Sequence, residues 1–156
     1  MKKVFVSIPL KGRSKEQIQD SLDKIKAAVE GLLDSEVELL HQDVKGLPDF
    51  DKDDVDDSID FIGEDLKLMA DADYFATIDC NWDFRHCSLE EDIFRRYKGD
   101  ERDRNNNMFR FSLNIIAPDV AKRKEKKPKN FGEWNSKNQK LRKPISKERI
   151  AIRKRG

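Results

Sequence analysis

The stretch YFATIDCNWDFRHCSLEEDIFRRY, residues 74–97, decides the fold and holds most of the reactive side chains. An apolar run over 73–79 predicts a strand, and the segment 89–97 predicts the start of a helix. Between them, a Trp, an Arg, a His, a Cys and two adjacent glutamates meet at one strand end. Side chains of these kinds form catalytic sites, metal sites or ordinary helix caps, and the rest of the sequence has to distinguish among the three.

Short apolar runs elsewhere predict three more strands. They are KVFVSIP at 3–9, EVELLH at 36–41 and FSLNIIA at 111–117, and prolines end the first and the last of them.

Two further helices are indicated by apolar residues at helical spacing. The first follows the sequence SKEQ, in which Ser14 and Gln17 fit a capping box. Its expected buried stripe consists of Ile18, Leu22, Ile25, Val29 and Leu32. The stripe of the second consists of Ile59, Ile62, Leu66 and Met69. Between the second strand and this helix, the aspartate-rich segment 42–57 predicts a loop.

This alternation of strands and helices predicts a flavodoxin- or Rossmann-like three-layer α/β sandwich with a mostly parallel sheet of four to five strands. In the common strand order 2-1-3-4, the ligand crevice lies beyond the carboxyl ends of strands 1 and 3. The loops 7–13 and 79–90 would face that crevice, which puts the opening stretch at the expected site.

Charge divides the chain sharply. Residues 1–100 contain 14 Lys+Arg and 25 Asp+Glu, whereas residues 101–156 contain 18 and 6. We therefore expect an α/β domain over 1–120 and a basic C-terminal extension over 121–156. The extension is a solvated tail, packs on the acidic domain, or binds a polyanion such as nucleic acid, and in the last two cases Phe131 and Trp134 are the docking groups.

The two cysteines, Cys80 and Cys87, do not make a disulfide framework, and their spacing without a second pair argues against a zinc site. No apolar run approaches the roughly 20 residues that span a bilayer. The N-terminus lacks the apolar region and cleavage site of a signal peptide. These features predict a cytoplasmic protein that has no metal and no membrane partner.

Cysteine chemistry remains open at the strand-3 loop. Cys87 would lie near a helix N-terminus beside Arg85 and His86, which are conditions that lower a thiol pKa. A half-buried packing cysteine has the same surroundings, so the sequence leaves both interpretations standing.

The two glutamates are stronger candidates. Ser88 and Glu91 fit a capping box as N-cap and third helical residue, which gives Glu91 a structural role. Glu90 is left without one, and the helix dipole favours its ionised form. An ionised carboxylate at this edge suits a nucleophile in glycosyl transfer, although helices also favour acids in their first turn.

Three blocks of sequence resemble the nucleoside 2-deoxyribosyltransferase-like superfamily, most of all its small prokaryotic and phage members. They are KVFVSIPLKGRSKEQI at 3–18, DLKLMADAD at 65–73 and WDFRHCSLEEDIFRRYKG at 82–99. The resemblance implies that Glu90 attacks the anomeric carbon of a nucleoside or nucleoside 5′-monophosphate. Asp79 and Asp83 would orient the sugar or protonate the leaving base. Water or a second base would complete the reaction without a cofactor.

The resemblance also implies which residues bind substrate. Its phosphate-binding turn corresponds here to Ser7, Lys11, Gly12 and Arg13, and the strand-3 loop adds Trp82, Arg85, His86 and Ser88. A basic surface loop is the alternative for the first group. The relatives carry glycine at the place of His86 and an aromatic residue at the place of Ser7, which puts catalysis in doubt.

Oligomers are common in this superfamily, so the resemblance implies a homodimer or a higher homo-oligomer. The alternative to an enzyme is a non-catalytic protein that binds a nucleotide in the crevice and nucleic acid through the basic extension.

Overall fold

The structure is a computed structural model that describes residues 1–42, 59–99 and 106–125. Nearly all of the predicted acidic loop and most of the predicted basic extension lie outside these ranges. The chain divides into two compact units, Met1–Lys122 and Arg123–Gly156, and the description below concerns the first.

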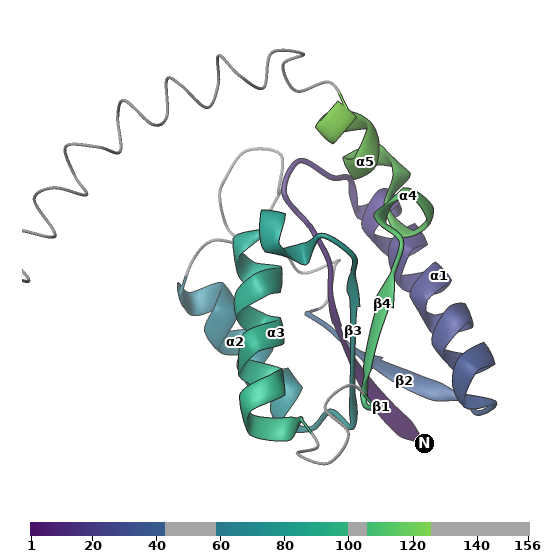
Figure 1. Cartoon of the computed structure of the whole chain (residues 1–156), viewed down its shortest axis with the longest axis vertical. Coiled ribbons are helices and arrows are strands. Elements are labelled where there is room, and N and C mark those ends of the chain that lie inside the picture. Colours follow the sequence, from purple (N-terminus) through teal and green to yellow (C-terminus); the bar gives the residue numbers. More distant parts are fainter. Residues whose placement is uncertain (43–58, 100–105, 126–156) are drawn as a thin grey trace, which may run out of the picture. The chain divides into compact units, whose positions relative to one another are not determined.

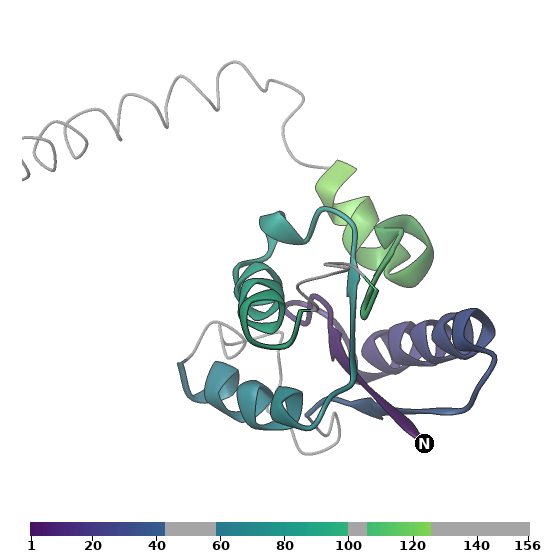
Figure 2. The same ribbon diagram turned by 60° about the horizontal axis from the view of Figure 1, so that its bottom comes forward.

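The first unit has a four-stranded parallel sheet with the order β2-β1-β3-β4, which confirms both the predicted α/β class and the predicted strand order. Figures 1 and 2 show α1 and α4 on one face of the sheet and α2 and α3 on the other. The described elements follow in chain order: β1 (Lys2–Ser7), α1 (Lys15–Leu33), β2 (Val37–Leu40), α2 (Ile59–Ala70), β3 (Tyr74–Ile78), the 3-10 turn η3 (Asn81–Asp83), α3 (Arg85–Lys98), β4 (Met108–Phe111), α4 (Leu113–Ile116) and α5 (Pro118–Glu125).

The central strand β1 separates two hydrophobic cores. Val4 and Val6 belong to the core beneath α1, whereas Phe5 belongs to the core beneath α2 and α3. Because side chains alternate along a strand, Ser7 points to the same face as Phe5. The last residue of β1 therefore presents a hydroxyl group toward α3.

Helix α1 confirms the predicted capping box. The Ser14 hydroxyl accepts from the Gln17 amide, and the Gln17 side chain accepts from the Ser14 amide. Four of the five predicted stripe residues are buried. Leu32 is the exception at 65% exposed, because the stripe rotates away from the sheet near the end of the helix.

The buried side of α2 differs from the predicted stripe. Ile59 is 88% exposed, whereas Phe61, Asp65 and Met69 are buried. These three residues are four apart and lie on one face of the helix. The prediction included Met69 but missed Phe61 and Asp65, and the second of these is a carboxylate, a residue type that is seldom buried.

The predicted strand at 111–117 is wrong. The strand is β4, three residues earlier, and residues 113–116 form the short helix α4. The Asp79 carboxylate accepts from the backbone amide of Leu113 at 2.8 Å, which stabilises the first turn of this helix. Leu113 and Ile116 turn inward together, whereas Ile115 is exposed. A short apolar run without clear periodicity fits either structure.

The predicted start of α3 is also wrong. The helix begins at Arg85, so Ser88 is its fourth residue and not its N-cap. Glu91 accordingly has no capping role. It forms ion pairs with Arg95 on the same helix and with Arg110 on β4, and its side chain is 11% exposed. Both glutamates of the opening stretch lie in the second turn of α3, where Glu90 contacts Ser7 of β1 and Glu91 contacts Arg110 of β4.

The predicted boundary between residues 120 and 121 falls inside α5. Val120 and Ala121 are both buried against the core beneath α1.

Candidate active site

Glu90 is buried at the carboxyl end of the sheet and is 1% exposed. Helix α3 carries it to the end of β1, where the Ser7 hydroxyl donates a 2.8 Å hydrogen bond to Oε1. The other oxygen, Oε2, has no hydrogen-bond partner among the described residues. A buried carboxylate oxygen without a donor costs free energy, and such groups are found where a ligand, a proton or a water molecule supplies the missing contact.

Asp65 lies beside Glu90 and changes its protonation. Burial raises the pKa of Glu90 well above the ordinary value of 4.5, and the neighbouring carboxyl group of Asp65 raises it further. The Ser7 hydrogen bond acts in the opposite direction. Two neighbouring carboxylates repel each other when both are ionised, so burial together with this repulsion favours a pair that holds one proton. Asp65 is itself anchored by Gln42, whose Nε2 donates to Oδ1 at 2.9 Å.

His86 closes the site on the α3 side. Its Nε2 lies 2.9 Å from the carbonyl oxygen of Ile8, and because a carbonyl only accepts, Nε2 carries a proton and donates it. The ring also meets Phe61 edge-on, with centroids 6.3 Å apart. Among the described residues other than glycine, positive φ occurs only at Asp34 and Cys80. His86 is therefore an unstrained helical residue, and the doubt raised by the glycine of the relatives does not apply to its backbone.

These side chains line one small cavity, with a volume of about 30 Å³. The lining consists of Val6, Ser7, Ile8, Leu10, Ile18, Leu22, His41, Gln42, Phe61, Asp65, His86 and Glu90. A cavity of this size holds one or two water molecules, whereas sites for drug-sized ligands measure about 300–1,000 Å³. The described lining residues include the carboxyl groups of Asp65 and Glu90 and no lysine or arginine, so the charged groups of the lining are acidic.

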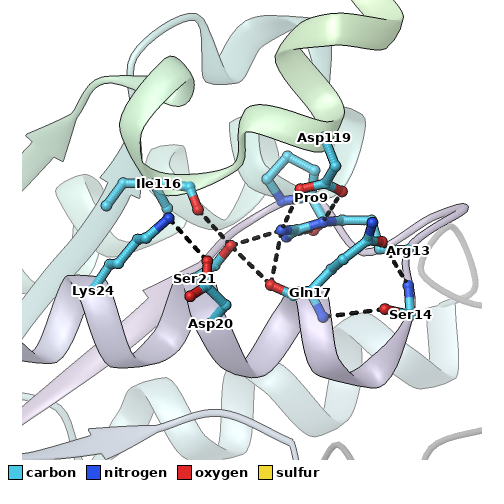
Figure 3. Close-up of polar contacts among 9 residues, drawn as sticks. All are labelled: Pro9, Arg13, Ser14, Gln17, Asp20, Ser21, Lys24, Ile116 and Asp119. Atoms are coloured by element: carbon cyan, nitrogen blue, oxygen red, sulfur yellow. Dashed lines mark hydrogen bonds and ion pairs between the residues drawn. The ribbon is translucent and has the colours of Figure 1, made fainter.

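The predicted phosphate loop is arranged differently. Gly12 has a φ of 69°, as a tight turn requires, and Lys11 and Gly12 are exposed. The Arg13 side chain is completely buried, however, and donates to Asp119, to α1 and to the Pro9 carbonyl (Figure 3). The first turn of α1 is closed by its own capping box. Arg13, which was predicted to bind a phosphate, therefore donates its hydrogen bonds to other residues of the protein.

Asp79 has a structural role as well. It is exposed, and its carboxylate caps α4 through the Leu113 amide. It does not line the cavity that contains Glu90.

Four predicted substrate-binding or catalytic residues form a separate group. Trp82, Asp83, Arg85 and Ser88 line a hollow on the surface of η3 and α3, together with Leu89, Glu91, Asp92 and Arg95. Trp82 is 68% exposed there. The structure therefore brings Ser7, His86 and Glu90 together and places these four residues outside their cavity.

The two cysteines lie apart from any described cluster of metal-binding side chains. Cys87 is completely buried, and its Sγ lies 3.4 Å from Nε2 of His86. In the described parts of the chain, no three His, Cys, Asp or Glu side chains gather in a way that could hold a metal ion.

Asp65 is the site residue that the sequence prediction missed. It belongs to a block that resembles the superfamily, but no role was assigned to it. The available signal was its position four residues from both Phe61 and Met69, which puts a carboxylate on the apolar face of an amphipathic helix.

In residues 1–42, 59–99 and 106–125, no helix is both long and apolar enough to cross a membrane. Comparison of the chain with family models, with curated proteins and with solved structures finds no match. The likeness to the nucleoside 2-deoxyribosyltransferase-like superfamily accordingly rests on the three sequence blocks alone.

Proposed function

We propose that the protein cleaves or transfers the N-glycosidic bond of a nucleoside or nucleoside 5′-monophosphate, with Glu90 as the nucleophile. The observation that carries the proposal is the carboxyl pair. Glu90 is buried at the carboxyl end of the central strand, has one oxygen without a partner among the described residues, and lies beside Asp65. Ligands of parallel α/β folds bind at this edge of the sheet.

A carboxyl pair that holds one proton supplies both groups that the reaction needs, an ionised carboxylate and a proton donor. The nucleophile must be ionised, and the leaving base must receive a proton as the C–N bond breaks. If the shared proton moves to Asp65, Glu90 becomes the carboxylate that attacks the anomeric carbon. Asp65 then protonates the base, which takes the electron pair of the C–N bond.

The second half of the reaction restores the pair. Water attacks the anomeric carbon, the ester bond to Glu90 breaks, and the proton of the water returns to the two carboxyl groups. A second base in place of water gives transfer instead of hydrolysis. We assign the proton donor to Asp65 and not to Asp79 or Asp83, because only Asp65 lines the cavity.

The choice between nucleoside and monophosphate now favours the nucleoside. Arg13 forms an ion pair with Asp119, and a 5′-phosphate would enter a cavity with two carboxyl groups and with no lysine or arginine among its described lining residues. Lys11 is the remaining cation of the predicted loop.

A non-catalytic binding protein is the second candidate, and the size of the cavity favours it. About 30 Å³ admits water but not a nucleoside, so catalysis requires the lining side chains to move apart on binding. In this candidate, the basic residues 126–156, with 12 Lys+Arg and two Asp+Glu, bind nucleic acid. Each neutralised phosphate releases counterions, so the affinity should fall steeply with salt.

The test of the enzyme compares the wild-type chain with Glu90→Gln on a panel of nucleosides and monophosphates, with free base measured by chromatography. We expect the substitution to reduce base release by a factor on the order of a thousand or more and to leave ligand binding nearly unchanged. Glu64→Gln is the matched control, because Glu64 is exposed on α2 and forms an ion pair with the exposed Lys67. Equal rates for wild type and Glu90→Gln would exclude the mechanism.

The test of the second candidate uses the full chain and a chain that ends at residue 125. Binding to a short duplex and to a single strand is measured at two salt concentrations. Salt-sensitive binding that disappears on truncation, together with no base release from any substrate, would support the binding protein over the enzyme.

A further inference from the structure

The loop between β1 and α1 is fixed at both of its ends. On the side of the carboxyl pair, Ser7 donates to Glu90, and the Ile8 carbonyl accepts from His86. On the other side, the Pro9 carbonyl accepts from Nη1 of Arg13 at 2.9 Å, and the Leu10 carbonyl accepts from the Arg13 amide at 3.2 Å. Adjacent residues of one short loop thus contact α3 and the Arg13 side chain.

Arg13 is itself held by a set of charged and polar contacts (Figure 3). Its Nε and Nη2 donate to the two carboxylate oxygens of Asp119 at 2.9 and 3.1 Å, which is the bidentate geometry of the strongest arginine–carboxylate pairs. Nη2 also reaches the hydroxyl of Ser21, which in turn donates to the Ile116 carbonyl. The guanidinium therefore joins the loop to α1, α4 and α5.

We propose that the Arg13–Asp119 pair positions the candidate active site, and that Asp119 on α5 acts on Glu90 through the loop that carries Ser7 and Ile8. As a statement about catalysis, this inference rests on the proposed function. As a statement about the geometry and protonation of Glu90, it can be tested even if the protein is not an enzyme.

The physical reason is that a fully buried guanidinium cannot lose its partner cheaply. The Arg13 side chain is 0% exposed, so without Asp119 its charge is buried with no counter-ion, which favours movement of the guanidinium toward water and away from the Pro9 carbonyl. Pro9 directly follows Ile8, so that movement disturbs the backbone that meets His86 and Glu90. Ile8 and Leu10 also line the cavity, and its volume would change with the same movement.

The experiment measures the protonation of Glu90 by carbon-detected NMR of side-chain carboxyl groups in the full-length chain. Wild type, Asp119→Ala, Ser7→Ala and the double variant are titrated, and Asp119→Asn and Arg13→Lys provide milder changes if Asp119→Ala does not fold. Ser7→Ala alone removes a hydrogen bond that lowers the pKa of Glu90. We expect Asp119→Ala to shift the titration of Glu90 in the same upward direction. In the Ser7→Ala background, it should shift the titration much less.

If base release is observed, the same variants are assayed for kcat and KM. Misplacement of a reacting group by about 1 Å costs roughly a hundredfold in rate, so we expect kcat to fall by up to about that factor in Asp119→Ala. Asp119→Glu, which keeps the charge, should recover part of the loss, and Glu64→Gln should have no effect. No base release from wild type would refute the proposed function and leave the titration to decide the positioning role.

The opposite result is equally clear. If Asp119→Ala or its milder substitutes lower the melting temperature but leave the titration of Glu90 as in wild type, the Arg13–Asp119 pair only stabilises the fold, and the positioning role is refuted. If Asp119→Ala shifts the titration of Glu90 equally in the wild-type and Ser7→Ala backgrounds, Asp119 does not act on Glu90 through Ser7. That result also contradicts the proposal.

Discussion

Ser7 and Glu90 are 83 positions apart in the chain, yet the Ser7 hydroxyl donates to the Glu90 carboxyl group at 2.8 Å. The bond joins the last residue of the central strand to the second turn of α3. Burial and Asp65 raise the pKa of Glu90, and the Ser7 bond is the contact that lowers it. The balance among these three effects sets the charge of the site.

Replacement of Ser7 by alanine should raise the pKa of Glu90 further, because burial and Asp65 then act without opposition. An NMR titration of the carboxyl group measures the change. Ser35→Ala, at an exposed position after α1, is the matched control and should leave the titration unchanged. A downward shift in Ser7→Ala would contradict the assigned direction.

The free energy of unfolding should depend on pH through Glu90. Because its pKa in the folded chain is raised above the ordinary 4.5, the folded state holds this proton more tightly than the unfolded state does. The resulting stabilisation is complete below the unfolded pKa and is lost as the pH rises through the folded pKa. Glu90→Gln cannot lose a proton, so its stability relative to wild type should increase as the pH rises above 4.5 in urea unfolding. A constant difference over this range would rule out the linkage.

Asp65→Asn should lower the pKa of Glu90, because it removes a negative charge beside it. The pKa should remain raised, since burial is the largest cause and is unchanged. If base release requires a proton on the pair, the alkaline limb of the pH–rate profile should move to lower pH, and the rate should fall because the proton donor is lost. A profile with an unchanged limb would remove Asp65 from the mechanism.

Glu91→Ala should destabilise the fold without changing the titration of Glu90. Glu91 is mostly buried and joins α3 to β4 through its ion pair with Arg110. Its loss should lower the free energy of unfolding by about 1–2 kcal/mol. A larger loss is not expected, because Arg110 is partly exposed and solvent screens the ion pair. Glu64→Ala removes an ion pair whose two members are both exposed, and it should cost less than about 0.5 kcal/mol. Chemical denaturation of both variants measures the difference, and equal losses would count against the bridge.

The parts of the fold that the sequence predicted correctly are those set by local patterns. The capping box of Ser14 and Gln17 is a four-residue signal, and the strand order follows from the alternation of strands and helices. Ser88 and Glu91 fit the same four-residue signal, but the helix starts at Arg85. A capping motif inside a longer helix is indistinguishable by sequence from one at its start, because both contain the same residues.

The site was predictable only in part, since two of its features depend on distant contacts. Glu90 follows from the position of the strand end. Asp65 does not, because its burial depends on the packing of α2 against α3. Arg13 was assigned to a phosphate because its partner, Asp119, is 106 positions away and nothing near Arg13 in the sequence indicates it.

The distance between Arg13 and Asp119 also matters while the chain is being made. Arg13 leaves the ribosome early, but the carboxylate that compensates its buried charge is synthesised 106 residues later. Domains generally fold as units during synthesis, and an uncompensated buried charge is strongly unfavourable. If Asp119 positions the loop as we propose, the loop beside Glu90 should reach its final packing only after α5 has emerged, and a ribosome stalled before residue 119 should hold a chain in which this packing is incomplete.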